Sequence, residues 1–348
     1  MSKPIPDTLI NRQWIYRQIP DGLVGPEHYE LREAPLDTRL AEGEVLIAAR
    51  YLSVDPYMRI QQARSQTWEA PHPLDTVQRG GAIAQVLDSR ADGIVAGDWV
   101  SAYSGWQTHA RVHQAELTRL DPGAAPVTTA LGVLGMPGRT AWFGLMEAGR
   151  PRPGDVVVVS GAAGAVGSLV VQFALRAGAR VLAIAGSADK CRWLVDTLGA
   201  EVAINYRDHE DSASLGAAIA ATVGQVDVYF DNVGGWISDA VLPLIALRAR
   251  VVICGQISQY GGGLDQPEAG PRWMHHLLYQ RASVRGILAR DFSARMDEMR
   301  ARVEPWVRAG EIHFEQSLLH GFEQLPAALQ GLFTGIHRGK VLVEVEQR

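Results

Sequence analysis

Hydrophobic and polar residues are distributed in different ways along different parts of the chain. Up to about residue 125, short half-apolar runs are separated by turns rich in Gly, Pro and Asp. The runs are Glu44–Ala49, Gly81–Leu87, Trp99–Ala102 and Thr108–Val112. Short runs with turn residues at this spacing are typical of antiparallel strands. The pattern therefore predicts a small, mostly antiparallel β domain in the first part of the chain.

From residue 155 to residue 287 the pattern changes, because near-continuous apolar runs alternate with helical segments. The apolar runs are Val156–Val159, Arg180–Ala185, Val226–Phe230 and Arg250–Cys254. Strands that are buried on both faces of a parallel sheet show this lack of polar alternation. Strands that alternate with helices predict a doubly wound α/β sheet.

The last part of the chain changes again and is predicted to return to the first domain. It contains the apolar runs Glu311–Ser317 and Lys340–Val345, with a helical pattern over Glu323–Phe333 between them. The predicted boundaries are therefore a β-rich domain over residues 1–128, a doubly wound domain over 129–308 and a returning segment over 309–348.

One segment of the doubly wound domain carries a specific chemical signal. Four consecutive valines lead into a turn that contains Gly161, Gly164 and Gly167, and an amphipathic helix follows until Gly178. Glycines let the backbone approach a pyrophosphate closely, and the start of the helix offers N–H groups and a positive dipole end. Strand, turn, helix and second strand come in the order of a dinucleotide-binding unit. The alternative is a structural turn in an unrelated α/β fold.

The end of the second strand distinguishes between the two nicotinamide cofactors. An NAD site usually has an acidic residue there, which binds the ribose 2′-hydroxyl. This chain has the small residues Gly186 and Ser187 instead, followed by Lys190. Small residues leave room for a 2′-phosphate, and the ammonium group of Lys190 can neutralise it, so NADPH is predicted. The alternative for Lys190 is an ordinary solvated residue in the first turn of a helix.

Composition excludes several other classes. The chain of 348 residues has a formal net charge of -5 and a sequence pI of about 6.1, which argues against a nucleic-acid partner. No apolar run is long enough to span a membrane, and the N-terminal residues lack the apolar core of a signal peptide. The two cysteines, Cys191 and Cys254, are far apart, so neither a disulfide framework nor a cysteine zinc site is expected. A cytoplasmic enzyme without a metal site fits these features.

Beyond these patterns, several longer motifs point to one family. They are YLSVDPYMR at Tyr51–Arg59, LGVLGMPGRTAWFGLMEAGRPRPGDVVVVSGAAGAVGS at 131–168, DNVGG at Asp231–Gly235 and CGQISQY at Cys254–Tyr260. With them the chain resembles the leukotriene B4 12-hydroxydehydrogenase / prostaglandin reductase branch of the medium-chain dehydrogenase/reductases. That branch includes plant alkenal double-bond reductases and bacterial curcumin reductases. The resemblance covers nearly the whole chain.

The resemblance implies a GroES-like β-rich catalytic domain, a Rossmann domain, a cofactor in the cleft between them and no catalytic zinc. It also implies a homodimer, with an exposed sheet edge or helix near Trp273–Tyr279 as a candidate surface. It further places cofactor contacts at Met136, Pro137 and Thr140 (nicotinamide end), Ala165 and Val166 (pyrophosphate), Gly186, Ser187, Lys190 and Tyr206 (2′-phosphate), Asn232 (nicotinamide ribose), Cys254, Ser258 and Tyr260 (cofactor and substrate cleft), and Ile287 and Leu288 (carboxamide).

The chain departs from the family pattern at two places. Near the C-terminus the branch commonly reads G-x-N-x-G-K, whereas this chain has His337 at the Asn position, followed by Arg338 and Gly339. We expect His337 and Gly339 to lie at the cofactor in the same way. After YMR, the family often continues with Gly, whereas Ile60, Gln61 and Gln62 follow here. The segment 63–77 therefore does not predict a substrate by analogy.

The resemblance implies reduction of a carbon–carbon double bond next to a carbonyl group. Hydride adds to the β-carbon of an enone or enal, and a hydrogen-bond donor stabilises the negative charge on the carbonyl oxygen. The expected donors are Tyr260 and the cofactor's own ribose hydroxyl, and Tyr57 is the second candidate. Each tyrosine is alternatively a partly buried aromatic residue with a satisfied hydroxyl. Two other functions stay open at this stage. One is an NADPH quinone oxidoreductase, and the other is a non-enzymatic NADPH-binding sensor.

Overall fold

The computed structural model describes residues 5–262, 264, 266 and 268–346, and it divides into two compact units. Unit 1 consists of Met1–Leu131, Gln316–Ile336 and Val341–Arg348, and unit 2 consists of Gly132–Glu315 and His337–Lys340. The chain thus leaves unit 1, forms unit 2 and returns to unit 1. A short stretch near the end, 337–340, belongs again to unit 2.

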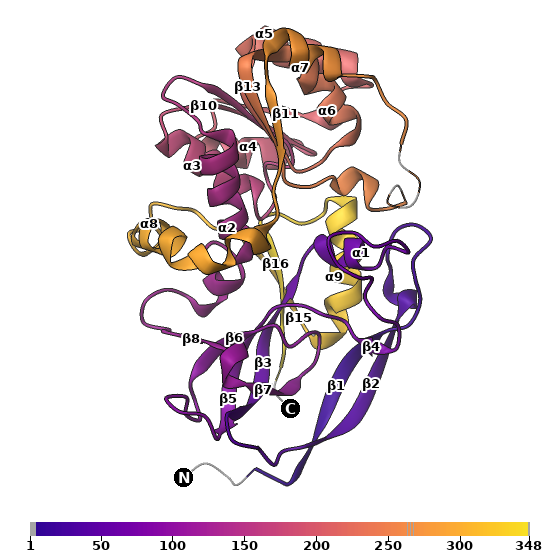
Figure 1. Cartoon of the computed structure of the whole chain (residues 1–348), viewed down its shortest axis with the longest axis vertical. Helices are drawn as coiled ribbons and strands as arrows, with labels where there is room; N and C mark the ends of the chain where they lie inside the picture. Colours follow the sequence, from indigo (N-terminus) through magenta and orange to yellow (C-terminus); the bar gives the residue numbers. More distant parts are fainter. Residues whose placement is uncertain (1–4, 263, 265, 267, 347–348) are drawn as a thin grey trace. The chain divides into compact units, whose positions relative to one another are not determined.

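Unit 1 is built on antiparallel strands (Figure 1). One sheet has the order β2-β1-β4, and a larger one has the order β15-β16-β3-β5-β6-β8, with β7 paired to β3. The strands are β1 Thr8–Tyr16, β2 Tyr29–Asp37, β3 Glu44–Val54, β4 Thr76–Val77, β5 Ala82–Ser89, β6 Trp99–Ala102, β7 His109–His113, β8 Thr118–Leu120, β15 Gln316–His320 and β16 Lys340–Glu344. Its α-helices are α1 Tyr57–Gln61 and α9 Leu325–Thr334, and short 3-10 helices span Pro26–His28, Gln114–Glu116, Val127–Leu131 and Phe322–Gln324.

Unit 2 is a parallel sheet with the order β11-β10-β9-β12-β13-β14. The strands are β9 Val156–Val159, β10 Arg180–Ala185, β11 Val202–Asn205, β12 Val226–Asp231, β13 Ile245–Ile253 and β14 Ser283–Gly286. The α-helices are α2 Met136–Phe143, α3 Gly167–Arg176, α4 Ala188–Asp196, α5 Ser212–Val223, α6 Gly235–Val241, α7 Met274–Gln280 and α8 Met296–Arg308. A π-helical turn spans Gly144–Gly149, and 3-10 helices span Tyr206–Asp208, Leu242–Leu244, Ile257–Gln259 and Ala289–Arg295.

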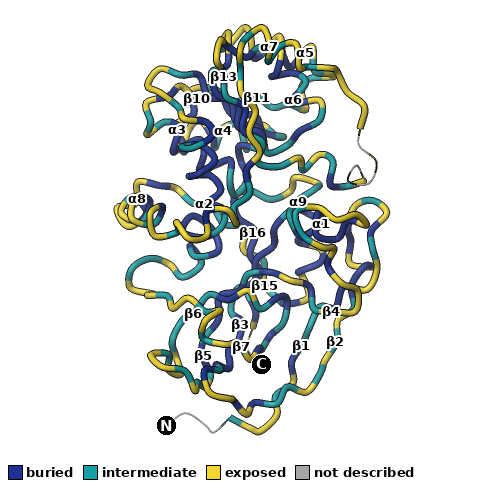
Figure 2. Tube along the Cα trace, viewed as in Figure 1, coloured by how far each residue is buried: buried dark blue, intermediate teal, exposed yellow. Residues whose placement is uncertain are grey.

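The strand order of unit 2 reverses at β9, because the chain first builds outward to β11 and then returns to the other side with β12. Ligands of open α/β sheets bind outside the carboxyl ends of the strands at such a switch point. The four valines of β9 are all buried, as Figure 2 shows for the central strands. Their burial on both faces explains why this strand shows no polar alternation in the sequence.

Some predicted elements are displaced in the structure. The run predicted over Glu311–Ser317 becomes a strand only from Gln316 onward, because the backbone at His313 is bonded elsewhere. Its N–H donates to Oε1 of Gln172 and its carbonyl accepts from Nε2 of Gln172, both at 2.8 Å. These bonds use the backbone N–H and carbonyl group of His313, which are then not available for pairing with a neighbouring strand. No helix among the described residues is long and apolar enough to cross a membrane.

Candidate functional site

The glycine-rich turn follows β9 directly and leads into α3 (Figure 1). Gly161 has φ +59°, in the left-handed region that favours glycine. A Cβ at Gly167 would come closer than 3.0 Å to the carbonyl oxygen of Gly161 and to Cα of Ala162. Only glycine therefore lets the first residue of α3 approach the turn this closely. Ala165 and Val166 lie in the same turn, immediately before the helix.

A segment from the end of the chain lies against this turn. Gly164 forms a parallel β-bridge with Gly339, and the N–H of Gly339 donates to the carbonyl oxygen of Ala163 at 2.8 Å. Gly339 has φ +67°, and a Cβ there would collide with the carbonyl oxygen of Glu315. The structure thus brings Gly339 beside the predicted pyrophosphate turn, although it lies far from the turn in the sequence.

The residues predicted for the 2′-phosphate gather at the ends of β10 and β11. Ser187 caps α4 by accepting a hydrogen bond from the N–H of Lys190 at 3.3 Å. The ring of Tyr206 lies so close to Gly186 that a Cβ on Gly186 would be 2.9 Å from it. Burial lowers the pKa of Lys190, and the charges of Arg207 and Arg338 lower it further. These two arginines are not among the site residues predicted from the sequence, although each directly follows one of them.

A buried carboxyl group connects the carboxyl ends of β9 and β12. Asp231 is only 1% exposed. Its Oδ2 accepts from the Ser238 hydroxyl at 2.5 Å, and its Oδ1 accepts hydrogen bonds from several groups. The donors to Oδ1 are the hydroxyls of Ser160 (2.9 Å) and Tyr229 (3.0 Å) and the N–H groups of Val233 (3.0 Å) and Gly234 (2.9 Å). Asp231 is not among the site residues predicted from the sequence, although it is the first residue of the DNVGG motif.

Asn232 is fixed in the same network. Its side-chain amide donates to the carbonyl oxygen of Ser160 at 2.7 Å, and its backbone N–H donates to the Ser160 hydroxyl at 2.9 Å. The loop after β13 packs on this turn, since the Ser258 hydroxyl donates to the carbonyl oxygen of Val233 at 2.7 Å. Asn232 and Ser258 are thereby held at the carboxyl end of β12.

Tyr260 ends this loop and is nearly buried, with 8% of its surface exposed. Its hydroxyl accepts a hydrogen bond from the N–H of Gln256 at 2.9 Å, and a hydroxyl that accepts in this way still has its own O–H to donate. Burial raises the pKa of Tyr260 to about 12, so the hydroxyl keeps its proton at neutral pH. Burial also raises the pKa of the Cys254 thiol to about 12, and the Asp231 carboxyl adds to this effect. A thiol with so high a pKa is a poor nucleophile.

Tyr57 lies in unit 1, where it begins α1. It is half-buried, and its hydroxyl donates to that of Tyr103 at 3.2 Å. Desolvation raises the pKa of Tyr57, and the negative charge of Asp55 contributes in the same direction. Like Tyr260, Tyr57 is therefore a protonated donor rather than a base at neutral pH.

The residues predicted for the nicotinamide end lie on α2 and after β14. Thr140 is buried, and its hydroxyl donates to the carbonyl oxygen of Met136 at 2.8 Å. The N–H of Ile287 donates to the carbonyl oxygen of Ile253 at 3.1 Å, which extends the pairing of β13 with β14. A Cβ on Gly144, just after α2, would collide with the side chain of Ile287. The end of α2 and Ile287, which Leu288 follows, are thus direct neighbours.

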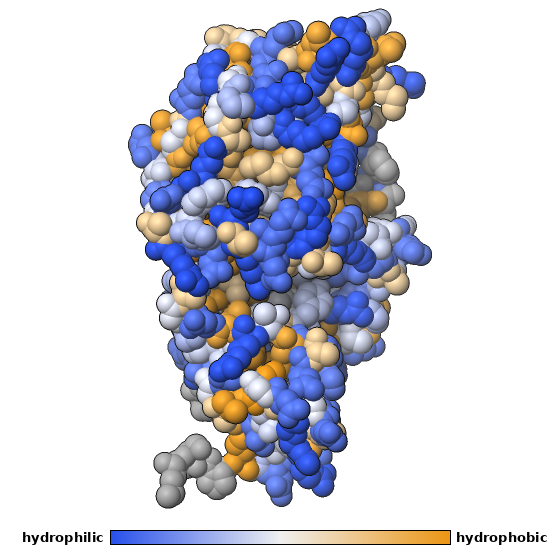
Figure 3. Space-filling model, turned by 60° about the vertical axis from the view of Figure 1, so that its left-hand side comes forward, coloured by the Kyte–Doolittle hydropathy of each residue, from blue (hydrophilic) through white to orange (hydrophobic). Residues whose placement is uncertain are grey.

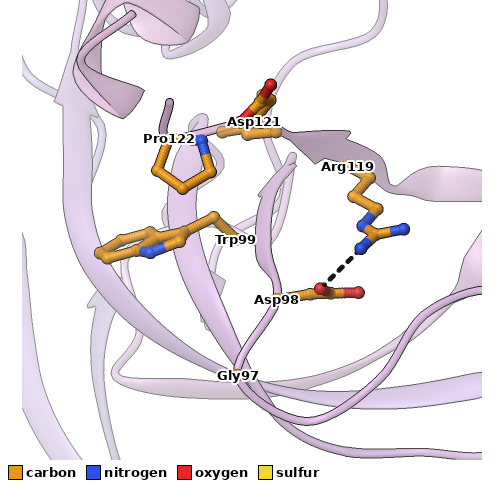
Figure 4. A pocket seen from close by; sticks show the side chains of 7 residues that line it. Gly97, Asp98, Trp99, Arg119, Asp121 and Pro122 are labelled. Atoms are coloured by element: carbon orange, nitrogen blue, oxygen red, sulfur yellow. Dashed lines mark hydrogen bonds and ion pairs between the residues drawn. The ribbon is translucent and has the colours of Figure 1, made fainter. Parts of the chain in front are cut away.

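A pocket in unit 1 contains none of the predicted site residues. It has a volume of about 450 Å³ and is lined by Gly97, Asp98, Trp99, Arg119, Leu120, Asp121 and Pro122. Figure 4 shows the ion pair between Arg119 Nη2 and Asp98 Oδ1, at 3.0 Å, on one side of this pocket and the ring of Trp99 near Pro122. Among the described residues, no group of three or more His, Cys, Asp or Glu side chains is placed to hold a metal ion.

Comparison with protein-family models gives two matches. Residues 12–120 match the N-terminal domain of oxidoreductases, and residues 165–304 match the family described as zinc-binding dehydrogenases. The NADPH-dependent curcumin reductase of Escherichia coli is 36% identical over 96% of this chain and 97% of its own length. The NADP(+)-dependent 2-alkenal reductase of Nicotiana tabacum is 34% identical over 97% of this chain and 98% of its own.

The structural comparison agrees with the sequence comparison. The crystal structure of CurA from Vibrio vulnificus in complex with NADPH has a TM-score of 0.90 and 36% identity, covering 97% of this chain and 100% of that one. The match confirms the predicted fold class, a GroES-like β-rich part with a Rossmann part. The chain belongs to the zinc-independent branch of the medium-chain dehydrogenase/reductase family that includes the curcumin, alkenal and prostaglandin reductases.

Proposed function

We propose that this protein reduces the carbon–carbon double bond of α,β-unsaturated ketones and aldehydes with NADPH. NADPH is the cofactor, as it is for relatives whose names state it. The observation that carries the proposed reaction is the Tyr260 hydroxyl. It is nearly buried, keeps its proton at neutral pH and lies in a loop packed on the carboxyl end of β12, at the switch point of the sheet.

The residues of unit 2 fit this cofactor. Gly161, Gly164 and Gly167 carry no side chain, so at these positions the backbone of the turn can approach a pyrophosphate closely. The end of β10 has no carboxylate. A carboxylate at this place would repel a 2′-phosphate. Lys190 follows in the first turn of α4. We propose as cofactor-binding residues Met136, Pro137, Thr140, Gly161, Gly164, Ala165, Val166, Gly167, Gly186, Ser187, Lys190, Tyr206, Asn232, Cys254, Ser258, Tyr260, Ile287, Leu288, His337 and Gly339.

Different groups serve the successive steps of the proposed reaction. When bound, NADPH supplies a hydride, which the β-carbon of the substrate accepts as the π bond breaks. Negative charge then collects on the carbonyl oxygen, and the Tyr260 hydroxyl donates a hydrogen bond to it. Tyr57 is the second candidate for the hydrogen bond to the carbonyl oxygen. The α-carbon then takes a proton from water or a tyrosine to complete the saturated product. We propose residues 1–128 with 309–348 as the catalytic domain and 129–308 as the NADPH-binding domain.

The test compares NADPH oxidation with an enone and with a quinone, using the wild type and Tyr260→Phe. We expect the wild type to reduce the enone, with the saturated ketone identified as product. Tyr260→Phe removes the donor to the developing oxyanion, so kcat on the enone should fall by about 100-fold. Tyr51→Phe removes a hydroxyl from a half-buried tyrosine of unit 1 and should leave kcat unchanged.

Two results would contradict the proposal. A wild type that turns over only the quinone would be a quinone reductase, and one that binds NADPH without turnover across enones, enals and quinones would be a binding protein. Full activity of Tyr260→Phe on the enone would remove Tyr260 from the mechanism while leaving the reaction intact.

We also propose a cytoplasmic homodimer that acts on small molecules and has no nucleic-acid or membrane partner. The support is the exposed surface of α7, where Met274, Leu278 and Tyr279 are 74%, 71% and 68% exposed. The edge strand β14 is exposed along its length. Figure 3 shows hydrophobic side chains among hydrophilic ones at the end of the molecule that carries α5 and α7.

The assembly is tested by sedimentation velocity. We expect the wild type to sediment as two chains and Leu278→Glu as one, because a carboxylate in an apolar interface loses its hydration without gaining a partner. Ile10→Glu, at a similarly exposed apolar residue of unit 1, is expected to remain dimeric. A Leu278→Glu variant that still sediments as two chains would exclude this surface.

A further inference from the structure

Three cations lie around the ends of β10 and β11 in unit 2. Lys190 is in the first turn of α4, and Arg207 follows Tyr206 in the short helix after β11. Arg338 comes from the segment whose next residue, Gly339, bridges to the phosphate-binding turn. They come from three different segments, of which only that of Arg338 lies far away in the sequence. Arg207 and Arg338 both lie near enough to Lys190 to disfavour its charged form.

The guanidinium of Arg338 is held in place on two sides. Its Nη2 and Nε donate to Oε1 of Glu315 at 2.6 and 3.2 Å. Its Cζ lies 4.9 Å from the ring centroid of Trp193, which is one helical turn after Lys190 on α4. An arginine fixed between a carboxylate and an indole ring has already lost most of its side-chain freedom, so a ligand that binds it has little ordering entropy to overcome.

The charges of this cluster favour an anionic ligand. Like charges that converge raise the free energy of the folded protein, and a bound anion reverses the sign of that interaction. Glu315 forms an ion pair with one of the three cations, Arg338. A phosphate monoester carries close to two negative charges at neutral pH and accepts bidentate hydrogen bonds from a guanidinium.

We propose that Arg338 is a specificity-determining residue for the 2′-phosphate of NADPH, acting with Lys190 and Arg207. The inference rests on the proposed function, which places the adenosine ribose beside Ser187. It goes beyond that function by assigning the discrimination against NADH to a residue of the C-terminal segment. Glu315 and Trp193 act as positioning residues, because they hold the guanidinium and do not themselves contact the phosphate.

The test measures binding of two adenosine nucleotides by isothermal titration calorimetry. Adenosine 2′,5′-bisphosphate and adenosine 5′-monophosphate differ only in the 2′-phosphate. Arg338→Leu is expected to weaken binding of the bisphosphate by about 10-fold or more, the effect of one charge-assisted hydrogen-bonding group. Binding of the monophosphate should change by less than about twofold. Arg338→Lys keeps the charge but loses the forked geometry, so its loss should be intermediate.

The chain offers a matched control. Arg176 has the same kind of surroundings in the same unit, with Nη2 2.8 Å from Oε2 of Glu311 and Cζ 4.5 Å from the ring centroid of Trp306. Arg176→Leu removes an equivalent ion pair and ring contact and should leave both nucleotide affinities unchanged. Lys190→Ala should resemble Arg338→Leu, since both remove a cation from the same phosphate.

The outcomes separate this inference from the proposed function. If Arg338→Leu weakens both nucleotides equally, Arg338 supports α4 through Trp193 and the inference is wrong. If Arg338→Leu weakens the binding of neither nucleotide, the 2′-phosphate binds elsewhere and the inference is also wrong. A wild type that prefers the bisphosphate in an Arg338-dependent way but reduces no enone would contradict only the proposed reaction.

Discussion

Replacing Gly167 with valine is expected to raise the Kd for NADPH by at least about 100-fold, which corresponds to roughly 2.8 kcal/mol of binding free energy. Any Cβ at this position would come closer than 3.0 Å to the backbone of Gly161 and Ala162, and neither contact is with a flexible side chain. The start of α3 must therefore move away from the turn. The N–H groups that the turn and the helix present together would then no longer converge on one pyrophosphate.

The measurement for this prediction is a fluorescence titration with NADPH, accompanied by thermal unfolding to confirm that the variant is folded. Gly167→Ala adds a single methyl group and should show the same direction with a smaller effect. Gly270→Ala is the control, because a Cβ there makes only ordinary van der Waals contact with Asp239. Unchanged NADPH affinity in a folded Gly167→Val protein would mean that this turn does not hold the cofactor.

Replacing Asp231 with alanine is expected to lower the free energy of unfolding by about 3–5 kcal/mol, the usual cost of leaving buried hydrogen-bonding partners without their carboxylate. The substitution removes the acceptor for three hydroxyls and two backbone N–H groups at once. It also releases Ser160, which fixes Asn232, so cofactor affinity should fall together with stability.

Urea denaturation gives the change in unfolding free energy, and the same strand provides the control. Asp227 is half-buried near the start of β12, and its carboxylate accepts one hydrogen bond, from the N–H of Val156 at 2.9 Å. Asp227→Ala should therefore cost only about 1 kcal/mol. If the two variants unfold at the same urea concentration, the Asp231 network does not contribute the stability that its hydrogen bonds indicate.

The elements that the sequence predicted well are those whose signal is local. The β9–turn–α3 unit could be predicted because four valines, three glycines and an amphipathic helix lie within one short segment. The absence of an acid after β10 was equally visible. Both features depend only on residues that are close together in the sequence. They can therefore be recognised without knowledge of the rest of the structure.

The features that the sequence did not predict depend on partners far away in the chain. Asp231 also accepts hydrogen bonds from residues close to it in the sequence, but Ser160 reaches it from the turn after β9, 71 residues away. Arg338 gains its position from Glu315 and Trp193, and no periodicity connects these three residues. The start of β15 shifted for the same reason, since the side chain of Gln172 took the backbone groups of His313.

The bridge between Gly164 and Gly339 has a consequence for biosynthesis. The strand, turn and helix around Gly164 are translated long before Gly339, so a nascent chain on the ribosome holds this turn with one of its flanks missing. The flank arrives only when residue 339 has been made, 175 residues after Gly164. Premature termination before that codon would therefore damage the nucleotide site itself, even though almost all of the Rossmann unit had already been synthesised.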